Sequence, residues 1–388
     1  MLAVPGARSF FLSAVPARVG VAMTSLGLLW LVRWGTGSYA VAGAVTGVFA
    51  VTSAFASPVS GRLAARFGQA RLLVPIAVLH AFAIGGLVVA VVLHCPLWTV
   101  FAFDVVAGAA LPPVSSLTAT RWSVLLAGSA ALPTAFALES LSNELAYLFG
   151  PALVGTVSAA LTPAGVGLAA SAILVGCLAL ARRRGTDPGH VVPAVDSGSR
   201  GWGGIAFVVL AAVNLGIGFF FGALQVSVTA FATGHAASGS AGLIYSALSI
   251  TSVLAGFGYG ARRWRLSAPR QLVVALGALT VGSLPMVFAA TPGMLALCLL
   301  LPGFGLAPSM ILVSLLTERV VAKSALTRAF AVLNSAGAVG TALACAIAGR
   351  AIDAHGAGWG FAIAVGSVGV AAIVSLGART RTAGGREG

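Results

Sequence analysis

Long apolar stretches alternate with short polar segments along almost the whole chain of 388 residues. A helix needs about 20 residues to cross the hydrocarbon core of a membrane. Twelve stretches reach that length, at about residues 10–32, 40–60, 71–93, 97–120, 135–158, 163–182, 204–232, 241–261, 271–290, 293–317, 328–350 and 358–378. A backbone in lipid must satisfy its own hydrogen bonds, so each stretch is predicted to be a helix. The pattern predicts an all-α integral membrane protein with twelve transmembrane helices.

The longest polar segment, residues 183–203, divides the twelve stretches into two sets of six. It contains Gly, Pro, Ser and Asp without a helical period, which is typical of a flexible linker. The two halves also echo each other, since Ala135-Phe136-Ala137 recurs as Ala329-Phe330-Ala331. Such echoes indicate an internal duplication. We therefore expect two pseudo-symmetric six-helix bundles, 1–182 and 204–388, joined by the linker.

Composition and charge support a membrane location. Hydrophobic residues make up 59% of the chain and charged residues only 8%, whereas a soluble domain has about 25% charged residues. The net charge of +14 would fit a nucleic-acid partner, but the basic residues are not placed for one. All but three of the 22 Lys and Arg residues fall on one predicted side of the membrane, the exceptions being Arg18, Arg33 and Arg350. By the positive-inside rule, both termini and the linker are predicted to be cytoplasmic, and we expect no nucleic-acid partner.

The lysine and arginine usage indicates the source membrane. Lys323 is the single lysine among the 22 basic residues. Arginine codons are richer in G and C than lysine codons, so the sequence fits a high-G+C bacterium and its plasma membrane. The first apolar run is too long for the core of a signal peptide and is predicted to be a retained helix.

Four ionisable residues fall inside predicted membrane helices: Arg18, Asp104, Glu139 and Glu144. Each costs about 2.5–3.5 kcal/mol on insertion scales, so such residues usually line a cavity, pair with one another and mark function. Arg18 could neutralise Asp104, Glu139 or Glu144, or bind an anionic substrate, and an internal ion pair is favoured. Asp104 lies nearer the outer side and could instead meet a cationic substrate.

The helix expected at 135–158 carries a polar stripe of Glu139, Ser140, Asn143, Glu144 and Tyr147. Residues four apart share a helix face, so Glu139 and Asn143 lie together, as do Ser140 and Glu144 on an adjacent face. We expect at least one of the two glutamates to load and release a proton. The alternative is a structural lock between Glu139 and Arg121.

The second half has neutral polar residues in its helices in place of charges. They are Asn214, Gln225, Tyr245 and Asn334. They are candidates for substrate binding, together with Asn143 and Tyr147, or they make hydrogen bonds between packed helices. This asymmetry predicts that the first half couples to protons and the second shapes the pocket.

Two motifs carry a family resemblance. The first follows the second helix and reads Gly61-Arg62-Leu63-Ala64-Ala65-Arg66-Phe67-Gly68-Gln69-Ala70-Arg71. It is similar to the Gly-x-Leu-Ala-Asp-Arg-x-Gly-Arg-Lys pattern of the major facilitator superfamily, with Ala65 in place of the usual Asp. Its glycines suit close helix approach and a tight turn.

The second motif, Gly150-Pro151-Ala152-Leu153-Val154-Gly155, resembles the Gly-Pro-x-x-Gly-Gly motif of exporting, proton-antiporting members of that superfamily. The match is partial, because Val154 replaces a glycine. A further departure is Asp104, which stands four residues before Gly108 where antiporters of the family often carry an arginine.

The resemblance covers the whole chain and implies a transporter that works by alternating access. Few polar residues line the expected cavity, so the predicted activity is proton-driven export of a small hydrophobic or amphipathic molecule, such as a drug or a secondary metabolite. The alternatives are an importer or sugar/metabolite permease of the same fold, and a non-transporting membrane sensor on that scaffold.

An enzyme is not expected. The sequence has no nucleotide-binding glycine loop, no metal-binding cluster and no Ser/His/Asp set. Without a Walker motif, ATP is not the fuel. We expect no cofactor or metal beyond the proton gradient, and a monomer in the bilayer with the substrate and protons as partners.

Overall fold

The computed structural model describes residues 6–126, 129, 131–183, 204–261, 264–321 and 326–384. Throughout this described part the regular elements are helices, and no strand occurs. The predicted linker at 183–203 lies outside it, except for Arg183. Two compact units emerge, one made of Met1–Gly37 and Val48–Ala194 and the other of Ser38–Gly47 and Val195–Gly388.

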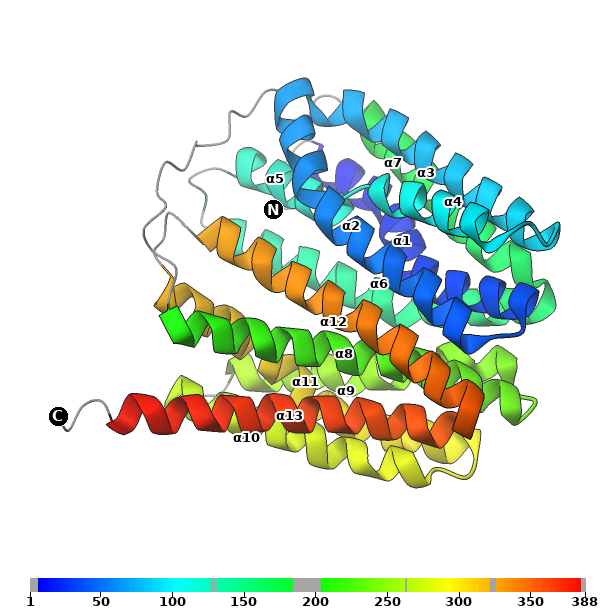
Figure 1. Cartoon of the computed structure of the whole chain (residues 1–388). Helices are drawn as coiled ribbons and strands as arrows, with labels where there is room; N and C mark the ends of the chain where they lie inside the picture. The colour runs from blue at the N-terminus through cyan, green and yellow to red at the C-terminus, as the bar shows by residue number, and fades with distance from the viewer. Residues whose placement is uncertain are drawn as a thin grey trace. The chain divides into compact units, whose positions relative to one another are not determined.

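The first unit contains most of the first-half helices (Figure 1). They are α1 (Ala7–Thr36), most of α2 (Tyr39–Phe67), α3 (Gln69–Val92), α4 (Leu97–Ala109), α5 (Val114–Leu125), α6 (Leu132–Ala160) and α7 (Thr162–Arg182). Glycines allow close packing of α1 on α7, since a Cβ on Gly176 would lie 2.4 Å from the backbone nitrogen of Ala17.

The second unit contains the remaining helices. They are α8 (Gly204–Gly234), η2 (Ser238–Ser240), α9 (Ala241–Ala261), α10 (Ala268–Ser283), η3 (Leu284–Phe288), α11 (Pro292–Val320), α12 (Leu326–His355) and α13 (Ala357–Gly384). Helices α8 and α12 run side by side in Figure 1, and a Cβ on Gly218 would lie only 2.0 Å from the carbonyl oxygen of Gly337. Small residues at such crossings are typical of membrane helices.

The start of α2 belongs to the second unit because it is tied to the end of α12. One carboxylate oxygen of Asp353 accepts hydrogen bonds from the Ser38 hydroxyl at 2.7 Å and the Ala40 backbone N–H at 2.9 Å, and the other accepts from the Tyr39 backbone N–H at 3.0 Å. A carboxylate at this position satisfies N–H groups that the first turn of a helix leaves unpaired. The sequence predicts that all of α2 lies in the first bundle, and its pattern gives no sign of these hydrogen bonds to Asp353.

One stretch that the sequence predicts to be a single helix is broken in the structure. The stretch at 97–120 forms two helices, α4 and α5, separated by residues 110–113. Pro112 and Pro113 lack backbone donors, and a proline disfavours helical geometry in the residue before it. Together α4 and α5 still form one candidate span, Leu97–Leu125.

Eleven segments of the described chain are long and apolar enough to cross a membrane. They include every predicted stretch except the one at 135–158, whose helix α6 is 29 residues long but carries the polar stripe. The predicted total of twelve membrane helices therefore depends on α6.

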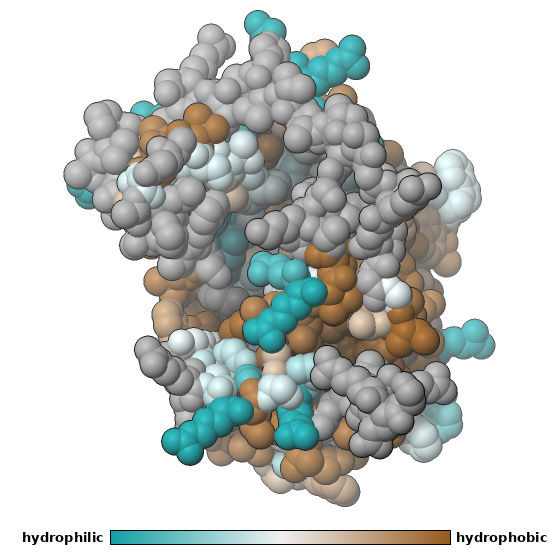
Figure 2. Space-filling view, turned by 90° about the vertical axis from the view of Figure 1, so that its left-hand side faces the viewer, coloured by the Kyte–Doolittle hydropathy of each residue, from teal (hydrophilic) through white to brown (hydrophobic). Residues whose placement is uncertain are grey.

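The motif after the second helix is helical for longer than expected. Helix α2 continues through the expected loop to Phe67, and Gly68 follows at a φ of +87°. Glycine suits this left-handed conformation, which agrees with the predicted tight turn. Gly61 does not serve close approach, because a Cβ there would meet no atom within 4 Å. The arginines Arg62, Arg66 and Arg71 are exposed. Figure 2 shows hydrophilic side chains interspersed with apolar ones on the face that it presents.

The glycine of the second motif does serve close approach. A Cβ on Gly150 would lie 2.8 Å from the Cβ of Ala22, so α6 packs tightly on α1 at this point. Pro151 lies inside α6, which continues past it to Ala160.

Candidate functional site

Three helices of the first unit, α1, α5 and α6, place a buried ion pair inside the bundle. Arg18 lies in α1 two residues after Pro16, and Glu139 lies in α6. The side chain of Arg18 forms a salt bridge with the carboxylate of Glu139, and the two residues are only 3% and 5% exposed. Of the partners considered from the sequence for Arg18, the structure brings Glu139 to it.

Neighbouring side chains add hydrogen bonds to both charged groups, although the Nε of Arg18 has no partner among the described residues. One terminal nitrogen of Arg18 donates to the Thr118 hydroxyl at 2.8 Å and the other to the Ser142 hydroxyl at 3.0 Å. Thr118 in turn donates to the same oxygen of Glu139 that Arg18 contacts. The second oxygen of Glu139 accepts from the indole N–H of Trp122 at 3.2 Å. We call Arg18, Thr118, Trp122, Glu139 and Ser142 the Arg18–Glu139 cluster.

Aromatic rings cover this cluster. The guanidinium of Arg18 lies 5.2 Å from the centroid of the Phe11 ring, within the range of a cation–π interaction. The ring of Phe10 meets Trp122 edge-on at 4.6 Å between centroids. Both Phe10 and Trp122 are fully buried. The rings strengthen the electrostatic attraction by excluding water from the pair.

The arrangement makes the two charges mutually dependent. Desolvating each ion is costly, and the attraction between them offsets that cost only while both remain charged. A proton on Glu139 would remove the negative charge and leave the guanidinium buried beside a neutral acid. The ion pair therefore stabilises the contact between α1 and α6 only while both side chains are charged.

Arg121 has a different position from the one the lock hypothesis requires. Its Nε donates to the side-chain oxygen of Gln69 at 2.8 Å, and one terminal nitrogen donates to the carbonyl of Arg183 at 3.2 Å. Gln69 also donates to the Leu117 carbonyl at 3.1 Å. Arg121 thus ties α5 to the start of α3 and the end of α7, while Arg18 pairs with Glu139.

Of the other polar stripe residues on α6, the structure describes the side chains of Asn143 and Tyr147. Asn143 accepts a hydrogen bond from the Ser115 hydroxyl at 2.9 Å, so Asn143 and Glu139 both contact α5. Tyr147 is about half exposed. The side chains of Ser140 and Glu144 lie outside the described part of the structure, so the predicted proton role of Glu144 stays a prediction.

The polar candidates of the second half lie on three helices of the second unit, α8, α9 and α12. Asn214 on α8 donates to the carbonyl of Leu333 on α12, which is a helix-packing hydrogen bond. Gln225 is buried, Tyr245 is half-buried and Asn334 is exposed. Their roles in binding a substrate stay predictions.

Sequence reasoning missed Thr118, Trp122 and Ser142 as members of the cluster. A usable signal existed, because Thr118 and Trp122 are four residues apart and therefore share a helix face. Ser142 follows Glu139 by three residues on α6, which also places the two side chains on one face. Trp122 lay beyond the expected end of its helix.

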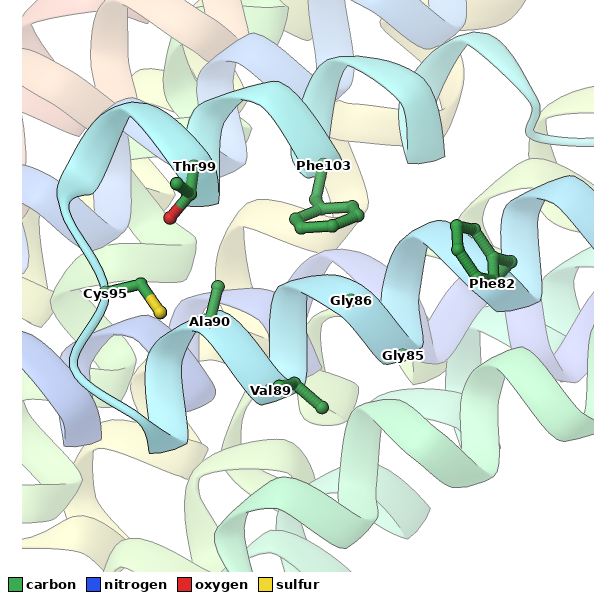
Figure 3. A pocket seen from close by; sticks show the side chains of 8 residues that line it. All are labelled: Phe82, Gly85, Gly86, Val89, Ala90, Cys95, Thr99 and Phe103. Atoms are coloured by element: carbon green, nitrogen blue, oxygen red, sulfur yellow. The ribbon is translucent and has the colours of Figure 1, made fainter.

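An apolar hollow of about 440 Å³ lies between α3 and α4, away from the cluster (Figure 3). Its lining carries no charged side chain and consists of Phe82, Gly85, Gly86, Val89, Ala90, Cys95, Thr99 and Phe103. A Cβ on Gly86 would lie 2.3 Å from the Phe103 ring, so the ring can pack here only because residue 86 has no side chain. The hollow can accept apolar groups but offers little for proton chemistry.

Solved structures resemble this arrangement over nearly the whole chain. The nucleoside transporter NupG is 16% identical with a TM-score of 0.72, and the match covers 96% of this chain and 99% of that one. A peptide transporter, POT, in complex with sulfate is 14% identical with a TM-score of 0.73, covering 96% and 93%. A bacterial homologue of the iron transporter ferroportin is 14% identical with a TM-score of 0.73, covering 95% and 97%.

The chain has the major facilitator fold. No family model and no curated protein sequence matches it. The likeness in structure thus agrees with the resemblance carried by the Gly61 and Gly150 motifs. The three similar structures are of proteins named for nucleosides, peptides and iron, so the fold does not single out a substrate.

Proposed function

We propose that this protein is a secondary transporter that exports a small hydrophobic or amphipathic molecule in exchange for protons. The observation that carries the proposal is the buried ion pair between Arg18 and Glu139. Charges inside a membrane bundle are costly and usually functional. No charged residue lines the hollow between α3 and α4, which fits an apolar cargo.

The pair supplies a coupling step by alternating between two states. When Glu139 is ionised, its attraction to Arg18 holds α6 against α1. When Glu139 takes up a proton, Arg18 loses its counter-ion and the contact between the helices weakens. A ligand changes a conformational equilibrium only through different affinities for the two conformations, and here the proton is that ligand.

The proposal includes the number of membrane helices, the location of the termini and the direction of transport. We include α6 among the membrane-crossing helices, which makes twelve, because Glu139 and Asn143 of its polar stripe make hydrogen bonds with Thr118 and Ser115 of α5. Both termini lie in the cytoplasm of a bacterium, as the distribution of arginines predicts. The partial Gly150-Pro151 motif favours export over import.

The test uses everted membrane vesicles whose interior is acidified by respiration and followed with a pH-sensitive dye. Addition of a transported compound to wild-type vesicles is expected to release protons and restore the fluorescence. The variant Glu139→Gln should abolish this recovery. Glu318→Gln is the matched control, because it makes the same chemical change at an exposed glutamate.

The outcome separates coupling from transport. Equal recovery in wild-type and Glu139→Gln vesicles would contradict proton coupling through Glu139. Movement of the compound only from outside to inside intact cells would make import the better account.

A further inference from the structure

A second buried carboxyl group lies apart from the Arg18–Glu139 cluster. Asp104 in α4 is fully buried, and neither of its carboxyl oxygens has a hydrogen-bond partner among the described residues. An ionised carboxylate in such surroundings would be very costly without a counter-ion or donors, and such a group takes its neutral form instead. Among the alternatives that the sequence leaves open for Arg18, neutralisation of Asp104 is not found, because Arg18 pairs with Glu139.

The neighbouring helices contribute one titratable group to this layer of the bundle. On α3, His80 is fully buried, and its Nδ1 lies 2.8 Å from the carbonyl oxygen of Ala107 in α4. On α2, Phe49 and Thr52 pack against Gly108, one turn beyond Asp104. The rings of Phe49 and His80 are 6.4 Å apart between centroids. Asp104 and His80 thus belong to the same packed layer of α2, α3 and α4.

The hydrogen bond of His80 determines where its proton lies. The carbonyl of Ala107 can only accept, so Nδ1 must carry the hydrogen. In the neutral ring, Nε2 is then a bare acceptor. Nε2 has no partner among the described residues. A charged imidazole would carry a second N–H at this position, and burying that charged donor without a partner would cost more free energy than burying the neutral ring. With a neutral His80 ring and a neutral Asp104 carboxyl group, this layer holds no uncompensated buried charge.

The two carboxyl groups lie at different depths. Asp104 precedes Thr118, the hydroxyl partner of Glu139, by fourteen positions along the α4–α5 span. The non-helical residues 110–113 lie between them, and no described hydrogen bond or ion pair joins Asp104 to the Arg18–Glu139 cluster. The two groups are therefore not one coupled pair.

We propose that Asp104 is a proton-binding site of its own, which holds its proton at neutral pH in this conformation and is separate from Glu139. The use of Asp104 as a second proton site in the transport cycle rests on the proposed function, whereas its protonation does not.

The test is infrared spectroscopy of the full-length protein reconstituted in lipid at pH 7.5. Carboxyl-labelled [¹³C]aspartate shifts the C=O band of a protonated aspartic acid and leaves that of a glutamic acid in place. The other aspartates are Asp187 and Asp196 in the polar segment at 183–203, and Asp353. Asp353 accepts three hydrogen bonds at the start of α2, which favours its ionised form.

We expect a protonated band in the unmodified protein that shifts with the aspartate label. Asp104→Asn should remove this band completely, while Glu139→Gln and the matched control Asp353→Asn keep it. The infrared band reports the protonation of Asp104, and the vesicle assay of Glu139→Gln reports proton coupling. The band is expected in Glu139→Gln even if the vesicle assay contradicts coupling, so each proposal can be refuted without the other.

Two results would overturn the inference. One is the absence of any label-sensitive protonated band in the unmodified protein at pH 7.5, which requires no substitution and does not depend on the folding of a variant. The other is a label-sensitive band that remains in Asp104→Asn, which would assign the proton to another aspartate.

Discussion

At the scale of the residue, the central feature is that Arg18 and Glu139 neutralise each other although 121 positions separate them. The sequence shows that both are costly in a membrane, because that follows from residue type and apolar surroundings alone. It does not select the partner, because Asp104, Glu139 and Glu144 all lie in first-half helices. The choice depends on which helices meet, and α1 meets α5 and α6 at this point.

The interdependence of the pair leads to a prediction about stability. Glu139→Gln should lower the free energy of unfolding by about 3–5 kcal/mol, because it leaves a buried guanidinium without its counter-ion. The double variant Arg18→Met/Glu139→Gln should recover most of that loss, since it removes the uncompensated charge. Thermal unfolding of the proteins in detergent measures the difference. A double variant no more stable than Glu139→Gln would show that the pair is not mutually dependent.

At the scale of the element, close helix contacts depend on glycines whose role is invisible in a hydropathy pattern. Gly218 in α8 faces the backbone of α12 at contact distance, while Gly277 in α10 has open space around it. Both lie inside apolar helices of the second unit, and only the structure separates the two environments. The helices themselves could be predicted from apolar length, apart from the break at residues 110–113 and the extension of α2 to Phe67. The apolar run that predicts this helix stops before Arg62, but α2 continues through Arg62 and Arg66 to Phe67.

These two glycines should respond to alanine with opposite signs. Gly218→Ala is expected to lower the free energy of unfolding by about 1–3 kcal/mol, because the new methyl group has no room at the α8–α12 contact. Gly277→Ala is expected to raise it by up to about 1 kcal/mol through helix propensity. Parallel denaturation of the two variants provides the comparison. Equal effects would mean that the α8–α12 contact is not as close as described.

The tie between Asp353 and the start of α2 can be tested separately. Asp353→Ala removes the acceptor for the Tyr39 and Ala40 amides, and loss of a cap costs about 0.5–2 kcal/mol. Hydrogen exchange in peptides that contain these amides should become faster. Asp353→Asn keeps one acceptor oxygen and should show a smaller change. Unchanged exchange in Asp353→Ala would exclude the cap.

At the scale of the whole molecule, the sequence indicates the fold through its apolar periodicity, its two halves and the Gly61 motif, and the structural likeness agrees over nearly the full length. The site is less predictable. Its charged members could be named from the sequence, but Thr118, Trp122 and Ser142 enter through packing. The assignment of residues 38–47 to the second unit is also a tertiary effect, because it depends on contacts with α12.

The predicted orientation is open to a direct check. Nearly all arginines fall on one side, so both termini should be cytoplasmic. A green fluorescent protein fused to the C-terminus should therefore fluoresce, and an alkaline phosphatase fused at the same place should be inactive. Active phosphatase at that position would reverse the orientation of the whole chain.

The central claim is that the protein exports its cargo by means of Glu139. The most direct measurement deletes the gene in its host and compares small molecules inside the cells and in the medium, with complementation by wild type, Glu139→Gln and Glu318→Gln. We predict a compound that accumulates inside the deletion strain and disappears from its medium. Wild type and Glu318→Gln should restore its release, and Glu139→Gln should not. A compound left behind in the medium of the deletion strain, or full rescue by Glu139→Gln, would contradict the account.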